Sequence, residues 1–245
     1  MARIPRIYVS TPITVGAEVP LDNRAAGHVL RVLRMSAGAE LVLFDGQGGE
    51  YPARLTQVTR QGAAAEVREH LPVERESSLR VTLGQGISRG ERMDYVIQKA
   101  VELGVAEIQP LFTERCVVQL KGARLERRLE HWRGIAIGAC EQCGRNTIPV
   151  IQPARSLSDW LAKDDPSPGL LLDPEAVSGI AALARMQSVR LLVGPEGGLS
   201  ASERRAGSAA GFRGVRLGAR ILRTETAPVA ALAAVQTLWG DLGES

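Results

Sequence analysis

The sequence predicts an α/β protein in two parts, a β-rich N-terminal unit followed by a layered α/β domain. Residues 1–71 carry short strand patterns, whereas the chain after residue 78 alternates strands with amphipathic helices. Two of the later strand patterns are nearly continuous apolar runs, which is typical of parallel strands buried on both faces. The segment 72–78 is polar and aperiodic, so we place the boundary there and expect domains at 1–72 and 73–245.

The N-terminal part is expected to contain one helix and three strands. The helix covers 23–33, is capped by Asn23, and repeats apolar residues at helical spacing. The strands are 41–44, which runs into an Asp45-Gly46 turn, then 50–58 and 63–67.

The second part is expected to contain five strands and several helices. The strands are 79–83, 105–112, 169–172, 189–193 and 214–217. The helices are 92–103, 125–143, one capped by Ser200 with Glu203, and a last one beginning near Ala227. Such alternation favours a parallel sheet covered by helices.

Composition and charge place the chain among globular proteins, with 44% hydrophobic and 23% charged residues. The net charge of +3 is small, but residues 1–34 concentrate arginines against only two acids. A basic surface of this kind suits a nucleic-acid partner, and a merely solvated arginine-rich face is the equally weighted alternative. The arginines concerned are Arg3, Arg6, Arg24, Arg31 and Arg34.

The cysteines and apolar runs indicate a reduced, cytoplasmic protein. We find three cysteines, no N-terminal signal pattern, and no apolar run long enough to span a membrane. Cys140 and Cys143 form a C-x-x-C pattern without the further ligands that structural zinc requires, so we expect no metal site. We interpret the pair as small buried residues on one helix face, and a redox site is a distant alternative.

Two loops that follow expected strands are candidates for ligand binding. The first, Gly194-Pro195-Glu196-Gly197-Gly198, ends a buried strand, and glycines there let a ligand approach the backbone. The second covers 217–227, where backbone groups can hold an adenine edge and Thr224 or Thr226 can cap the last helix. The alternative interpretation is that both are simple connections.

Two further segments are candidates for contacts with RNA. Arg89 and Arg92 lie at a helix start after a glycine-rich stretch whose spacing does not match a dinucleotide fingerprint. They suit phosphate contacts, or simply a charged helix start. After the C-x-x-C pattern, Gly144 ends a helix and is followed by Arg145 and Asn146, which suit base or phosphate contacts.

Taken together, these segments resemble the RsmE family, the ribosomal RNA small-subunit (uracil-N3)-methyltransferases of the SPOUT superfamily. The matching stretches span nearly the whole chain in order. They are RIPRIY at 3–8, HVLRVLRM at 28–35, SRGERMDYVIQKAVELG at 88–104, IQPLFTERC at 108–116, IAIGACEQCGRN at 135–146, LVGPEGGLS at 192–200 and LGARILRTETA at 217–227.

The resemblance implies a PUA-like β-barrel followed by a SPOUT α/β domain that carries a trefoil knot, in a protein that works as a homodimer. It implies S-adenosyl-L-methionine as cofactor and methylation of N3 of a uridine in 16S rRNA of the assembled small ribosomal subunit. The implied cofactor pocket comprises Leu172, Gly194, Glu196, Gly197, Leu217, Gly218, Ile221, Leu222, Thr224 and Ala227.

The chemistry then needs a cation near O2 or O4 of the uracil and a group that orients the cofactor or removes the N3 proton. Our candidates are Arg223 and Arg145 for the cation, and Glu196 for the carboxylate. The alternatives are a SPOUT methyltransferase with another RNA target and a non-catalytic RNA-binding or ribosome-assembly factor.

Overall fold

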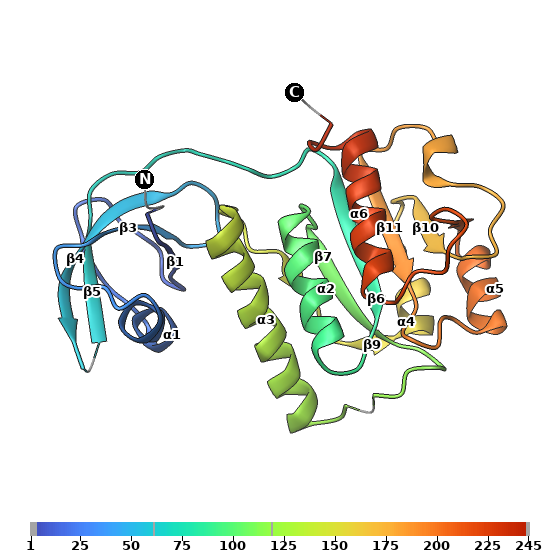
Figure 1. Ribbon diagram of the computed structural model, residues 1–245, viewed down its shortest axis with the longest axis horizontal. Coiled ribbons are helices and arrows are strands. Elements are labelled where there is room, and N and C mark those ends of the chain that lie inside the picture. The colour runs from blue at the N-terminus through green and yellow to red at the C-terminus, as the bar shows by residue number, and fades with distance from the viewer. Residues whose placement is uncertain (1–3, 61, 119, 244–245) are drawn as a thin grey trace. The chain divides into compact units, whose positions relative to one another are not determined.

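The computed structural model describes residues 4–60, 62–118 and 120–243, and it divides into two compact units (Figure 1). The first unit comprises Met1–Glu76 together with Cys140–Ile148. The second comprises Ser77–Ala139 and Pro149–Ser245. The first unit therefore contains a short segment, Cys140–Ile148, that is far from the rest of that unit in the sequence.

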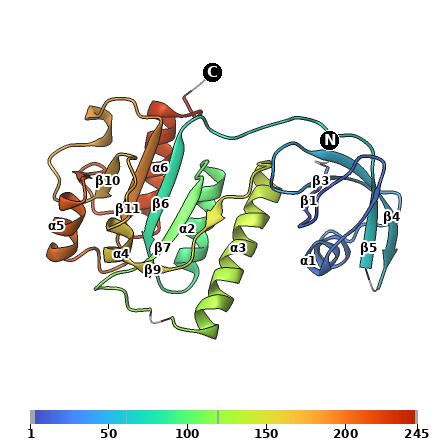
Figure 2. The ribbon, with the colours of Figure 1, turned by 180° about the vertical axis from the view of Figure 1, so that it is seen from behind.

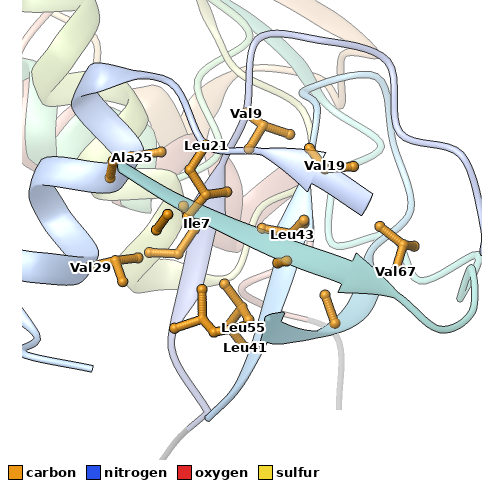
Figure 3. Packing of buried hydrophobic residues seen from close by; sticks show 14 residues of the cluster. Ile7, Val9, Val19, Leu21, Ala25, Val29, Leu41, Leu43, Leu55 and Val67 are labelled. Atoms are coloured by element: carbon orange, nitrogen blue, oxygen red, sulfur yellow. The ribbon is translucent and has the colours of Figure 1, made fainter. Parts of the chain in front are cut away.

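The first unit is a five-stranded sheet with one short helix. Its strand order is β1-β3-β4-β5-β2, with β1 parallel to β3 and the other pairs antiparallel. The elements are β1 (Arg6–Tyr8), β2 (Glu18–Pro20), α1 (Asn23–Gly27), a π-helical turn η1 (His28–Val32), β3 (Glu40–Phe44), β4 (Tyr51–Thr59) and β5 (Gly62–Val67). Figure 3 shows apolar side chains from these strands, α1 and η1 meeting in one core, among them Ile7, Leu43 and Val29.

The helix expected over 23–33 differs from prediction in its cap and its continuation. Asp22, not Asn23, is the N-cap, because its carboxylate accepts the N–H of Ala25 at 2.8 Å. The α-helical part ends at Gly27, and η1 then widens the turn, with the Leu33 N–H donating to the carbonyl of His28 at 3.0 Å. A π-helical turn of this kind is rare and is frequent at functional sites.

The second unit is a parallel sheet covered by helices, so the predicted α/β class is confirmed. Its strands are β6 (Arg80–Gly86), β7 (Glu107–Phe112), β8 (Val150–Ile151), β9 (Arg155–Ser156), β10 (Gly169–Leu172), β11 (Ser188–Val193) and β12 (Phe212–Val215). Its helices are α2 (Glu91–Glu102), α3 (Ala123–Cys143, whose last turn belongs to the first unit), α4 (Leu157–Leu161), the 3₁₀ turn η2 (Ile180–Ala182), α5 (Ala201–Ala209) and α6 (Thr226–Trp239).

The strand order of this sheet creates a place for a ligand. The order is β12-β10-β11-β6-β7-β8, with β9 also paired to β7. From β6 the chain leaves toward β7, and from β11 it leaves toward β12, so it departs in opposite directions from two neighbouring strands. Ligands of open parallel sheets bind at such a switch point, outside the carboxyl ends of the strands.

Helices cover both faces of the sheet. In Figures 1 and 2, α2 and α6 lie side by side along one face. On the other face Trp160 of α4 packs with Leu171 and Leu192 of the strands. Within the described residues, no helix has the length and apolar character to cross a membrane.

The last strand begins two residues earlier than predicted, at Phe212 rather than Gly214. Gly211 makes the turn with a φ of 84°, and Phe212 is then buried with its ring 5.4 Å from that of Trp160. The sequence pattern did not indicate that Phe212 would be buried. Its burial determines where β12 begins to pair with β10.

Candidate functional site

The two glycine-bearing loops that follow β11 and β12 lie together in the second unit. The Thr224 hydroxyl donates to the carbonyl oxygen of Gly194 at 2.9 Å, and Thr224 is buried. The N-cap of α6 is Glu225, without a side-chain cap bond, so the expected capping by Thr224 or Thr226 is wrong. Thr224 joins the two loops instead.

Two buried polar residues that sequence reasoning missed lie at the same point. The Gln85 amide nitrogen donates to the carbonyl of Gly86 at 3.0 Å, and the Ser88 hydroxyl is 3.2 Å from that of Thr224. The amide oxygen of Gln85 is buried and has no hydrogen-bond partner in the part of the chain that the structure describes. Since buried acceptors are nearly always satisfied, this atom points to a bound group. The available signal was a glutamine set between two glycines, Gly84 and Gly86, at the end of β6.

Absent side chains keep the loops close to the strands. A Cβ on Gly194 would lie 2.8 Å from the carbonyl carbon of Gly198 and from the nitrogen of Leu199. A Cβ on Gly86 would lie 2.6 Å from the nitrogen of Pro195. By contrast, Gly218 has a φ of 77° and open space where its Cβ would be, so its backbone is approachable by a ligand.

Glu196 anchors the first loop to the start of α2. Its carboxylate accepts the N–H of Arg89 and a guanidinium N–H of Arg92, each at 2.8 Å. Burial alone would raise the pKa of the Glu196 carboxyl. The hydrogen bonds from Arg89 and Arg92 favour the charged form more strongly, so the pKa lies below its ordinary value. Glu196 is therefore an ionised acceptor and a weak base.

Further charged groups lie beside the two loops. Arg92 also lies 3.7 Å from the carboxylate of Glu225, and Arg115 donates to the carbonyl of Gly197 at 3.0 Å. The Arg223 side chain is 82% exposed, with its guanidinium 4.0 Å from Glu225. Arg223 is thus a cation open to a substrate. Arg115 and Glu225 also belong to this site, although the sequence analysis did not select them.

The other predicted pocket residues occupy the ends of these strands. Leu172 is the last residue of β10 and is half-buried. Leu217 and Leu222 are half-buried in the second loop, whereas Ile221 is 83% exposed there. Ala227 lies in the first turn of α6.

Arg145 and Asn146 belong to the first unit. Arg145 is 4% exposed, and its guanidinium donates to Glu76 through two nitrogens, at 2.9 and 2.5 Å. Asn146 is fully buried and bonds the carbonyl of Val73 and the guanidinium of Arg6. Arg6 also pairs with Glu50 at 2.5 Å. These side chains fasten the segment Cys140–Ile148 to β1 and to the chain before β6.

The remaining arginines proposed for RNA are placed differently from one another. Arg24 pairs with Glu141 at 2.8 Å. Arg31 and Arg34 are exposed, and Arg34 has a φ of 51°. Arg3 lies outside the described residues. The exposed cations of this set therefore lie in η1 and just after it.

The two cysteines of the C-x-x-C pair differ in burial, and Cys143 is only partly buried rather than buried as expected. Cys140 is buried, and its burial raises the pKa of the thiol to about 12. Across the described ranges, no group of three or more His, Cys, Asp or Glu side chains is arranged to hold a metal ion.

Both units match known families. An RNA methyltransferase domain matches residues 75–236, and an RNA methyltransferase PUA domain matches residues 21–68. Ribosomal RNA small subunit methyltransferase E of Buchnera aphidicola subsp. Schizaphis graminum is 36% identical over 98% of each chain.

Solved structures agree. A methyltransferase of Legionella pneumophila in complex with the bound cofactor SAM is 40% identical, with a TM-score of 0.96 over 98% of this chain and 100% of that one. Ribosomal RNA small subunit methyltransferase E of Neisseria gonorrhoeae bound to S-adenosyl methionine is 42% identical, with a TM-score of 0.91 and the same coverage.

The fold and the matched domains define an RNA methyltransferase with an N-terminal PUA-like domain. Within that class, the chain belongs to the ribosomal RNA small subunit methyltransferase E family, and the resemblance found in the sequence is confirmed.

Proposed function

We propose that this protein uses S-adenosylmethionine to methylate N3 of a uridine of 16S rRNA in the assembled small ribosomal subunit. The observation that carries the proposal is the pair of loops joined by Thr224 and Gly194 at the switch point of the sheet. Family membership supports the reaction class, and the relatives from Legionella and Neisseria were solved with the cofactor bound.

The residues of the second unit fit the cofactor. The orphaned oxygen of Gln85 offers an acceptor for an N–H donor of the ligand, and the adenosyl and amino-acid ends of the cofactor both carry such donors. The open backbone at Gly218 and the predicted Leu172, Leu217, Ile221, Leu222 and Ala227 would hold its adenosine. Gly194 and Gly197 would allow close approach. When bound, the cofactor supplies an electrophilic methyl group on a sulfonium.

The protein must make N3 of uracil nucleophilic. The N3–H bond is broken, and an N3–CH₃ bond forms as the bond between the methyl carbon and the sulfonium sulfur breaks, with the bonding electrons left on sulfur. Loss of the N3 proton leaves the ring in a state with negative charge on O2 and O4. Arg223, with its exposed guanidinium, would stabilise that charge, and the proton leaves to water. Glu196, held by Arg89 and Arg92, orients the first loop rather than taking the proton.

The first unit would hold the RNA. The exposed Arg31 and Arg34 would contact the RNA strand. Arg6, Arg145 and Asn146, being buried in the polar network, would position that surface, and Arg24 would help through Glu141. Arg89 and Arg92 would contact RNA beside the cofactor.

The same proposal includes a homodimer in the cytoplasm, a trefoil knot in the second unit, and domains bounded at 72/73. The first three are what the family resemblance implies, and the boundary falls between the two matched domains, residues 21–68 and 75–236. Light scattering of the purified protein tests the oligomeric state.

Nucleoside analysis tests the reaction. Small subunits that lack the modification are incubated with the pure protein and labelled S-adenosylmethionine, and N3-methyluridine is the expected product. A different labelled nucleoside would mean another target. Absence of transfer together with no calorimetric binding of the cofactor would favour a pure RNA-binding factor.

Exchange of the exposed arginine tests the chemistry. Arg223→Ala should lower turnover by about 10²–10³-fold, as removal of an oxyanion donor does. Arg220→Ala, in the same loop and also exposed, is the matched control and should stay near wild type. Equal rates for the two variants would remove Arg223 from the mechanism.

A further inference from the structure

The first unit contains a cavity of about 750 Å³ that the proposed reaction does not use. It lies between the helical face of α1–η1 and the end of the β4–β5 hairpin. The lining residues are Asn23, Ala26, Gly27, Leu30, Arg31, Val58, Thr59, Arg60 and Gly62. Pockets for small ligands span roughly 300–1,000 Å³, so a nucleotide fits this volume.

The space arises from the choice of residues on one helix face. Positions 23, 26, 27, 30 and 31 recur at the spacing of a single face. At the middle of that face stand Ala26 and Gly27, which leave room. The helix passes into η1 at Gly27, and the wider turn carries Leu30 and Arg31 along the same side.

The lining combines two cations with apolar surface. The Arg31 guanidinium lies over Gly27, where a Cβ would be 2.5 Å from its Nη2 atom. Arg31 and Arg60 are exposed and form no ion pair within the described residues. Leu30 and Val58 are half-buried and form an apolar wall. None of the lining residues that the structure describes is acidic.

We propose that this cavity receives one unstacked nucleotide of the RNA strand. The base would rest on Leu30 and Val58, with the plane of Arg31 against it and the Asn23 amide at its edge. Arg60 would contact the adjoining phosphate. RNA is read in this way where a base is splayed out onto a side-chain surface or a guanidinium plane. The inference rests on the proposed function, because it takes the bound polymer to be ribosomal RNA.

Filling the cavity tests the inference. Gly27 has φ −61° and ψ −37°, so Gly27→Leu keeps the helical backbone, and the nearest atoms to its Cβ belong to the flexible end of Arg31. The variant should weaken binding of the full chain to 16S rRNA about tenfold or more, as the loss of one base contact does. Affinity for S-adenosylmethionine, measured by calorimetry, should not change.

A matched variant controls for the exchange itself. Gly134→Leu places the same side chain on an exposed helical position of α3 with open space around its Cβ, and should bind 16S rRNA as wild type does. A smaller substitution at the same position gives a graded test. Gly27→Ala adds one methyl group and should fall between wild type and Gly27→Leu.

Crosslinking gives a direct readout. 16S rRNA containing 4-thiouridine is irradiated with the wild-type protein, and crosslinked peptides from residues 23–31 or 58–62 are expected. Gly27→Leu binding within twofold of wild type, or crosslinks confined to other peptides, would overturn the inference. Its failure is distinguishable from failure of the proposed function, which is read from methyl transfer by the wild-type protein. Competition by uridine monophosphate alone, without loss of RNA binding in the variant, would show a free-nucleotide site and contradict an RNA contact.

Discussion

Two segments that the sequence singled out in the same way have different roles in the structure. The glycine-bearing loops after β11 and β12 gather at the switch point of the sheet, with Thr224 bonded to Gly194. The Arg145-Asn146 pair after α3, chosen for its exposed polar chemistry, is instead buried in the first unit against Glu76 and Arg6.

The difference lies in what decides each role. A glycine at a strand end acts through its own backbone, and the strand order then places the loop. An arginine acts through whichever partner it finds, and the partners of Arg145 and Asn146 are about 70 and 140 residues away in sequence. The loops could therefore be located from local sequence, whereas the placement of Arg145 and Asn146 depended on partners far along the chain.

Removal of Glu76 should give the largest effect, because the buried guanidinium of Arg145 then loses its carboxylate partner. The variant tests whether Arg145 has a structural role. Glu76→Ala leaves the 4% exposed Arg145 without its bidentate partner and should lower the free energy of unfolding by about 3 kcal/mol. Glu40→Ala breaks an exposed pair with Arg68 and should cost less than about 1 kcal/mol. Urea denaturation measures both, and equal losses would contradict a structural role for Arg145.

Prediction from sequence succeeded where periodicity or glycine placement decided the outcome. The strand over 169–172 and the capping box at Ser200 and Glu203 are as expected, because each is set by local residues. The start of β12 at Phe212 and the buried Gln85 depend on packing between distant elements. The sequence did not identify Asp22 as the N-cap of α1, because Asp and Asn are similarly favoured at this position.

The glycine contacts of the loops provide the next test. Gly194→Ala forces a Cβ to within 2.8 Å of backbone atoms of Gly198 and Leu199, which must shift. We expect a stability loss of about 2 kcal/mol and at least tenfold weaker binding of S-adenosylmethionine. Gly214→Ala, whose Cβ would lie 3.6 Å from that of Ala176, is the control. Calorimetry that finds the two variants alike would mean that the loop is not closely packed.

The charge of Glu196 gives a smaller effect that depends on pH. Its folded pKa lies below the ordinary value of 4.5, so its contribution to stability is present above that pH and is lost as the pH falls through the folded pKa. The thermal midpoint of the wild type should therefore fall more between pH 6 and pH 3.5 than that of Glu196→Gln. A variant that is equally acid-sensitive would show that the bonds from Arg89 and Arg92 do not favour the charged form.

Substitution of the two cysteines should have no effect on methyl transfer. With burial raising the pKa of Cys140 to about 12, almost none of this thiol is ionised at pH 8, and only the thiolate reacts. Cys140 should resist iodoacetamide in the folded protein and react once the protein is unfolded, as mass spectrometry can follow. The double variant Cys140→Ser, Cys143→Ser should retain methyl transfer. Loss of transfer with normal cofactor binding would give this pair a chemical role, and the contrast between backbone motifs and reactive side chains would no longer hold.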